Sequence, residues 1–122
     1  MDRAFFIMGA VLAGLGVAAG AFGAHALRGR LTPDLLNVFE TGVRYHLIHA
    51  LGLLSVAWAT TRWSGYVVNA AGWLFLLGTV LFSGSLYALS LSGARALGAI
   101  PPVGGFAFIA GWLALAWAAC QG

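Results

Sequence analysis

One short run of the chain concentrates the side chains that could do chemistry. Between Phe39 and His49 it carries an acid, a guanidinium, a phenol and two imidazoles, namely Glu40, Arg44, Tyr45, His46 and His49. Imidazoles can move protons or bind metals. His46 and His49 are three residues apart, so on a helix they share one face. A third imidazole, His25, precedes this run.

Metal or haem binding is the first chemistry to weigh. Three imidazoles could hold zinc or copper, but no cysteine or second carboxylate accompanies them, and Glu40 can pair with Arg44 one turn later. A haem would need His25 as its second axial ligand, since His46 and His49 cannot reach opposite faces of one ring. We therefore predict no metal and no cofactor, and keep metal or haem binding as a third hypothesis.

The composition places this run inside a membrane protein. Only 7% of the 122 residues are charged and 61% are hydrophobic, whereas about a quarter of a soluble domain is charged. Residues 63–94 and 96–122 contain no charge, which is typical of segments that lie in lipid. Six arginines without a basic stripe exclude a nucleic-acid partner.

The elements that must position the polar run are transmembrane helices. We predict one transmembrane domain over 1–122, an all-α bundle with spans at about 4–24, 43–61, 66–91 and 100–120. Between the first two spans, Thr32 can cap a helix that begins at Pro33. Its apolar residues share one face, so residues 33–42 are predicted to form a short interfacial helix, with a bend at Gly42.

Small residues indicate where these helices approach one another. We predict helix packing at five glycines, which are Gly16, Gly20, Gly84, Gly104 and Gly105.

Polar residues gather toward one side of the predicted bundle, where spans one and three end and spans two and four begin. The candidate ligand site or polar cluster there comprises His25, Glu40, Arg44, Tyr45, His46, His49, Ser83, Ser85 and Tyr87. Ionisable groups inside spans are costly and point to function. His49 is the deepest, and we expect it to lie near His25 and the segment 83–87, bonding to a serine hydroxyl or a backbone carbonyl.

Motifs from every span resemble one family. They are Gly20-Ala-Phe-Gly-Ala-His-Ala-Leu27, Glu40-Thr-Gly-Val-Arg-Tyr45, His49-Ala-Leu51, Leu81-Phe-Ser-Gly-Ser-Leu-Tyr87 and Pro102-Val-Gly-Gly-Phe-Ala-Phe-Ile-Ala-Gly-Trp112. The chain thus resembles the small membrane proteins of domain-of-unknown-function family 423, the YgdD- and YwdK-like and transmembrane-protein-256-like proteins. The resemblance implies a four-helix membrane protein without an established activity. It leads us to expect Gln where this chain has His46, so imidazole is not essential there.

These features favour a non-enzymatic membrane protein. The sequence lacks a nucleophile with an adjacent base and paired carboxylates for acid–base work. We expect the chain to act through helix–helix contacts in the lipid bilayer, as a homo-oligomer or as an accessory subunit of a larger membrane complex. The alternative is an ion or small-solute transport component that uses the polar cluster.

The arginines predict an orientation. Four of them, Arg28, Arg30, Arg44 and Arg95, lie toward one side of the bundle, against Arg3 and Arg62 on the other. The positive-inside rule then places both termini outside the cytoplasm, in a bacterial inner membrane.

Overall fold

Four long helical rods make up the fold, and three of them are apolar over a length that can span a membrane. The computed structural model describes residues 2–122. Three rods contain or adjoin tighter or wider turns, labelled η. In order, the elements are α1 (Asp2–Phe22), η1 (Gly23–Leu27), α2 (Pro33–Arg62), α3 (Tyr66–Gly78), η2 (Thr79–Ser83), α4 (Gly84–Ser92), η3 (Arg95–Ala99) and α5 (Pro101–Gln121). The predicted all-α membrane bundle is confirmed.

The ends of these helices follow ordinary stop and start signals. The Thr32 hydroxyl accepts a hydrogen bond of 3.3 Å from the Leu35 backbone N–H and caps α2, with Pro33 as its first residue. Gly93 ends α4 with a φ of 73°, which glycine adopts without strain. Pro101 begins α5. Local sequence therefore decides where each rod starts and stops.

The second rod differs from its expected division into two helices. The segment predicted as a separate interfacial helix (33–42) and the predicted span (43–61) form one uninterrupted helix of 30 residues, about 45 Å long. The helix continues through Gly42, whose bare backbone receives the Tyr87 ring; a Cβ there would lie 3.0 Å from that ring. The hydrocarbon core is only about 30 Å thick, so α2 extends beyond it.

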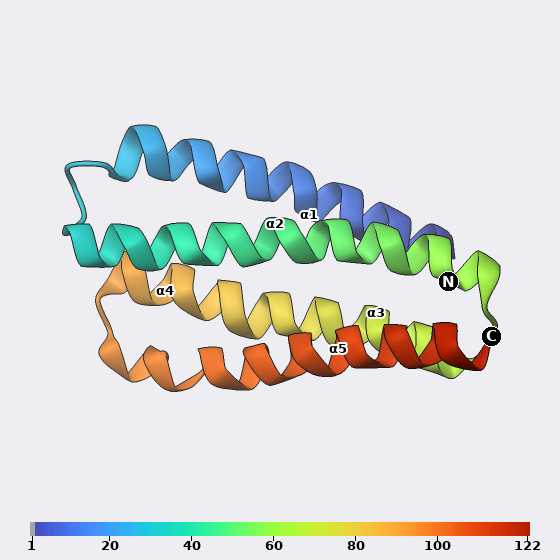
Figure 1. Cartoon of the computed structure of the whole chain (residues 1–122). Coiled ribbons are helices and arrows are strands. Elements are labelled where there is room, and N and C mark those ends of the chain that lie inside the picture. Colours follow the sequence, from blue (N-terminus) through green and yellow to red (C-terminus); the bar gives the residue numbers. More distant parts are fainter. Residues whose placement is uncertain (1) are drawn as a thin grey trace.

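Three of the rods are long and apolar enough to cross a membrane by composition alone, namely Asp2–Leu27, Tyr66–Ser92 and Arg95–Gln121. The fourth, α2, carries the two buried imidazoles of His46 and His49. It runs alongside the others for its full length (Figure 1). A helix enclosed by its neighbours can carry polar residues at membrane depth, because they face protein instead of lipid.

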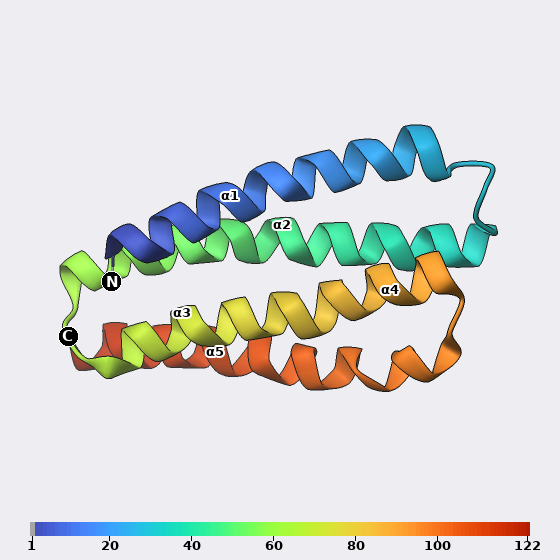
Figure 2. The same ribbon diagram turned by 180° about the vertical axis from the view of Figure 1, so that it is seen from behind.

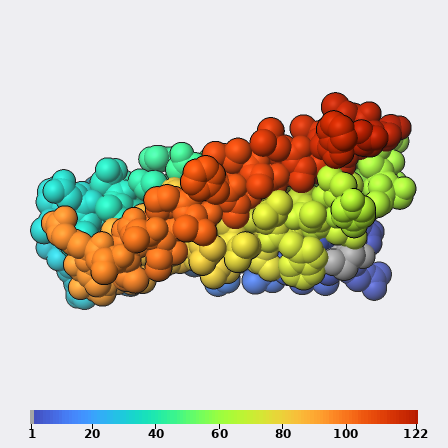
Figure 3. All heavy atoms as spheres, turned by 90° about the horizontal axis from the view of Figure 1, so that it is seen from below, coloured from blue at the N-terminus to red at the C-terminus, as the bar shows by residue number. Residues whose placement is uncertain are grey.

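The rods run antiparallel in an elongated bundle. Both chain ends and the turn from α2 to α3 lie at one end, and the turns from α1 to α2 and from α4 to α5 lie at the other (Figures 1 and 2). α1 packs chiefly on α2 and α5 packs on α3, while α2 also contacts α3 and α4. Seen from below, α5 runs obliquely across the bundle, and parts of the other rods are visible on both sides of it (Figure 3).

Aromatic rings seated on glycines bring the helices together. At four of these glycines an added Cβ would overlap a neighbouring ring: Phe5 on Gly72, Phe39 on Gly23, Phe75 on Gly111 and Phe108 on Gly78; at Gly52 it would lie 3.1 Å from the Phe75 ring, a tight contact. On the first rod, formed by α1 and η1, the contacting glycines Gly9, Gly16 and Gly23 recur every seven residues, the spacing of a left-handed helix pair. Large rings thus fill the space that missing side chains leave.

The glycines predicted to mediate packing have unequal surroundings. A Cβ at Gly16 would lie 2.5 Å from Leu47, and one at Gly104 would lie 2.5 Å from the Phe82 backbone nitrogen. One at Gly20 would make an ordinary 3.4 Å contact with Val43, whereas Gly84 and Gly105 have no such neighbour within 4 Å. Neighbouring glycines, such as Gly104 and Gly105, therefore differ sharply in whether they leave room for a side chain.

This contrast yields a matched pair of substitutions. Gly104→Ala should destabilise the bundle by about 1–3 kcal/mol, since the methyl group would push the α5 backbone away from that of η2. Gly105→Ala should be neutral or stabilising by up to about 1 kcal/mol, because alanine is the better helix former. Thermal unfolding in detergent, followed by circular dichroism, compares the two. Equal destabilisation by both would contradict the described packing of α5.

Candidate functional site

His46 joins three of the rods. Its Nε2 lies 2.7 Å from the backbone carbonyl oxygen of Leu12 in α1, and its Nδ1 lies 2.8 Å from the hydroxyl of Tyr87 in α4. A carbonyl oxygen can only accept, so Nε2 carries the proton and donates it. In the neutral ring, Nδ1 then accepts from the Tyr87 hydroxyl. One imidazole on α2 thereby fastens both α1 and α4.

The bond to Leu12 depends on a bare stretch of α1. Gly16 lies one turn after Leu12, and a Cβ at Gly16 would sit 3.3 Å from the His46 ring as well as overlap Leu47. Without side-chain atoms at this point, His46 reaches the main chain of α1. Because the acceptor is a backbone atom of α1, this hydrogen bond can form only when α1 and α2 lie close together.

His49 binds in the opposite sense. Its Nε2 lies 3.0 Å from the indole Nε1 of Trp112 in α5, and its Nδ1 lies 2.8 Å from the Tyr45 backbone carbonyl, one turn earlier in α2. An indole N–H can only donate, so Nε2 must be the acceptor and Nδ1 carries the proton. His46 and His49 therefore hold opposite neutral tautomers, one turn apart.

Aromatic rings enclose His49. The Phe108 ring stacks on the imidazole with a centroid separation of 3.5 Å and an interplanar angle of 6°, and Phe75 meets it edge-on at 5.3 Å. Only 3% of His49 is exposed. The ring is thus packed against protein on its face and its edge, and it binds through its two nitrogens.

Hydroxyl groups add to the same layer of the bundle. Ser83, which ends the π-helical turn η2, donates to the Gly42 carbonyl of α2 at 2.7 Å. Ser85 is also buried but bonds to the Phe82 carbonyl of its own segment. A π-helical turn inside a helix is rare and often lies at a functional position. Here it adjoins the contact between α2 and α4.

Three residues of the predicted cluster lie elsewhere. His25, Glu40 and Arg44 are exposed, and within residues 2–122 no ion pair joins Glu40 to Arg44. His25 lies in η1, about 20 Å along the first rod from Leu12, the residue that His46 contacts. The expected proximity of His25 to His49 is therefore wrong. Tyr45 is 38% exposed; its ring lies tilted against Phe82, at 4.8 Å between centroids, and parallel to that of Phe108, at 6.4 Å.

Trp112 is the partner that sequence reasoning missed. In the sequence it stands only at the end of a motif shared with the family, and it was not placed in the polar cluster. Yet it lies near the middle of α5 (Pro101–Gln121), where an indole N–H has no water to bond and needs an acceptor. That depth was the signal available. No sequence signal could have identified the Leu12 carbonyl as a partner of His46, because every residue carries the same main-chain oxygen.

These hydrogen bonds can hold the helices together, and they occupy the ring nitrogens of both buried histidines. Both nitrogens of His46 and of His49 have hydrogen-bond partners inside the chain. Across residues 2–122, every buried side-chain nitrogen and oxygen has a partner. No three histidine, cysteine or acidic side chains of the described chain gather as a metal-ligand set. The chemistry of these groups is hydrogen bonding across helices.

Comparison with known proteins agrees with the fold. The chain is 51% identical over 120 residues to UPF0382 membrane protein YwdK of Bacillus subtilis, covering 98% of each chain. It is 48% identical over 113 residues to UPF0382 membrane protein SH2409 of Staphylococcus haemolyticus, covering 93% of this chain and 92% of that one. These names describe membrane proteins and no enzymatic activity. No solved structure matches.

The family comparison covers the middle of the chain. The sequence pattern of the family described as "Protein of unknown function (DUF423)" matches residues 19–105. These residues run from the end of α1 to the start of α5 and include both buried imidazoles. Together with relatives that share about half of its residues over nearly their full length, this match shows that the chain belongs to the DUF423 family of membrane proteins.

Proposed function

We propose that this protein is a non-enzymatic helix-packing component of the bacterial inner membrane, which works as a homo-oligomer or as an accessory subunit of a membrane complex. The observation that carries the proposal is the use of both nitrogens of His46 and of His49 in bonds inside the bundle. Groups that are occupied in this way hold the protein in shape. They leave the lateral helix faces as the surface on which it can act.

Those faces are apolar and extensive. Only 17% of the most apolar window of the first rod is buried within the chain. Val11, Leu15 and Val17 of α1 are more than half exposed, as are Phe106 and Leu113 of α5. In a membrane such faces meet either lipid or another helix. They support a role in which α1 and α5 contact neighbouring membrane proteins.

The orientation belongs to the same proposal. The arginine excess near the turns from α1 to α2 and from α4 to α5 favours a cytoplasmic position for that end, and a non-cytoplasmic one for both termini. The lone and exposed Cys120 near the C-terminus is a natural reporter. A membrane-impermeant maleimide should label it from outside intact spheroplasts; labelling only after lysis would reverse the orientation.

Cross-linking in native membranes tests the packing role. In a Cys120→Ser background, Gly14→Cys on α1 and Gly105→Cys on α5 each add a thiol where an added side chain meets no atom within 4 Å. We expect a bifunctional maleimide to trap at least one of the two as a discrete dimer or as an adduct of defined mass. Gly104→Cys, which points at the Phe82 backbone, serves as the buried control.

Two results would contradict this proposal. One is a strictly monomeric protein at both exposed positions, together with no partner retained after gentle extraction. The other is a protein-dependent ion or solute flux in proteoliposomes, which would favour the transport hypothesis instead. A flux equal to that of empty liposomes is the expected result.

A double-mutant cycle tests whether His49 is a structural fastener. His49→Phe keeps an aromatic ring against Phe108 but leaves the Trp112 N–H without its acceptor, and should cost about 1–3 kcal/mol of unfolding free energy. Adding Trp112→Phe should recover part of that loss, since both polar partners are then gone. The coupling energy expected for a contact between spans is about 0.6–1.7 kcal/mol, measured by unfolding in mixed micelles. Additive effects would show that the bond does not hold α5.

A further inference from the structure

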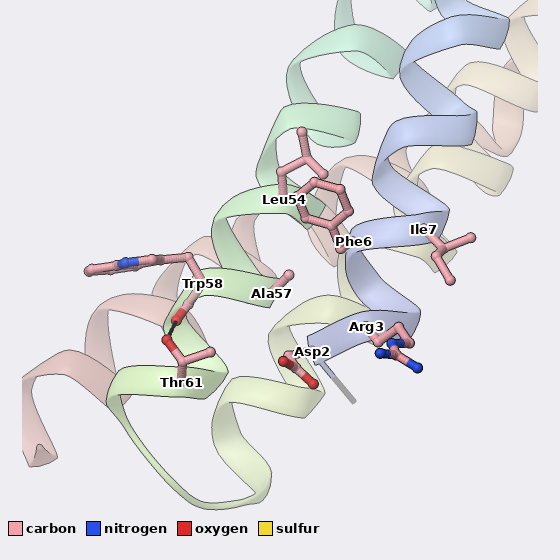
Figure 4. Close-up of a pocket in the computed structure, with 8 residues that line it drawn as sticks. All are labelled: Asp2, Arg3, Phe6, Ile7, Leu54, Ala57, Trp58 and Thr61. Atoms are coloured by element: carbon pink, nitrogen blue, oxygen red, sulfur yellow. Dashed lines mark hydrogen bonds between the residues drawn. The ribbon is translucent and has the colours of Figure 1, made fainter.

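A groove opens between α1 and α2 at the end of the bundle that holds both chain termini. It has a volume of about 470 Å³, within the range of sites that hold small ligands. In Figure 4 the apolar side chains that form its wall lie farther along α1 and α2, and the polar side chains at its mouth lie near the ends of these helices. Its lining residues are Asp2, Arg3, Phe6, Ile7, Leu54, Ala57, Trp58 and Thr61.

The wall of the groove suits a hydrocarbon chain. Phe6 and Ile7 of α1 and Trp58 of α2 are 57%, 55% and 57% exposed, and Leu54 lies between the helices beside Phe6 (Figure 4). In a bilayer this open side faces lipid. An acyl chain lying along α1 and α2 would cover these side chains and bury apolar surface on both.

The mouth carries one charge of each sign. Asp2 and Arg3 begin α1, and Figure 4 shows their side chains leaving the helix in different directions, with the Asp2 carboxylate on the side of Thr61. Among residues 2–122, another cation at this end, Arg62, lies 6.0 Å from the Trp58 ring centroid and lines a neighbouring cavity with Trp63. The mouth itself therefore presents a carboxylate beside a guanidinium.

These charges discriminate among lipid headgroups. A phosphodiester can accept hydrogen bonds from the Arg3 guanidinium, which suits phosphate geometry. A primary ammonium can donate to the Asp2 carboxylate, which has about four acceptor sites and can serve an ammonium alongside its contacts within the chain. A trimethylated ammonium has no N–H to donate, and an uncharged polyol headgroup brings no ammonium to this carboxylate.

We propose that this groove is a binding site for an aminophospholipid, with the phosphodiester on Arg3, the primary ammonium on Asp2 and one acyl chain along Phe6, Ile7 and Leu54. The site is independent of any role in helix packing with partners. It lies at the start of α1, where a span begins and lipid headgroups are found.

Competition among lipids with identical acyl chains tests the site. The full-length protein is exchanged into micelles with equal amounts of phosphatidylethanolamine, phosphatidylcholine and phosphatidylglycerol, and retained lipid is counted by native mass spectrometry. The wild type should retain the ethanolamine lipid about threefold over each of the others, the scale of exposed charge pairs. Glycerophosphoethanolamine, which lacks acyl chains, should not compete, because the apolar wall contributes to binding.

Single substitutions assign the two contacts. Asp2→Asn should abolish the preference for ethanolamine over choline, and Arg3→Gln should weaken retention of all three phospholipids together. Arg95→Gln, at the opposite end of the bundle, is the control and should change nothing. Asp2 and Arg3 are exposed, and circular dichroism checks that each variant keeps its helices. Equal retention of the three lipids by the wild type, a preference for phosphatidylglycerol, or an Asp2→Asn variant that still prefers ethanolamine would overturn the proposal.

Discussion

The bundle depends on satisfying two imidazoles that lie at membrane depth on a single helix. An unpaired polar group in hydrocarbon costs several kcal/mol, so His46 and His49 need partners inside the protein. They find them on different rods. His46 bonds to α1 and α4, while His49 bonds to α5 and packs against α3 through Phe75. α2 is therefore the helix to which all the others are bonded or packed. The opposite tautomers let His46 donate from Nε2 to α1 and let His49 accept at Nε2 from α5.

Glycine provides the geometry that these bonds require. His46 reaches a main-chain carbonyl because Gly16 leaves the surface of α1 bare, and Tyr87 reaches His46 because its ring passes over Gly42. Phe108 stacks on His49 while seated on Gly78. Hydrogen bonds and close packing thus share the same residues. A glutamine in place of His46 could preserve the pattern, since its amide also offers one donor group and one acceptor.

The sequence was sufficient for the bundle and for the importance of buried imidazole, but insufficient for the pairing. Charge-free segments long enough to span lipid predict helices without tertiary information, and the depth of His49 in its span marks it as buried. The partners depend on how each helix rotates about its axis, which periodicity does not determine when a helix is apolar all round. Trp112 was therefore missed. His25 was placed too close because it lies about 20 Å along the first rod from the residue that His46 contacts, and the helix 33–62 was divided in two because Gly42 was expected to bend it.

The tautomers of the two rings test the central claim most directly. Histidine-selective ¹⁵N solid-state NMR of the protein in lipid bilayers distinguishes protonated from bare ring nitrogens, and His46→Gln and His49→Gln variants assign the signals. The account predicts a neutral His46 with its proton on Nε2 and a neutral His49 with its proton on Nδ1. Finding the same tautomer at both rings, or an imidazolium at His49, would contradict the bonds that hold the four rods together.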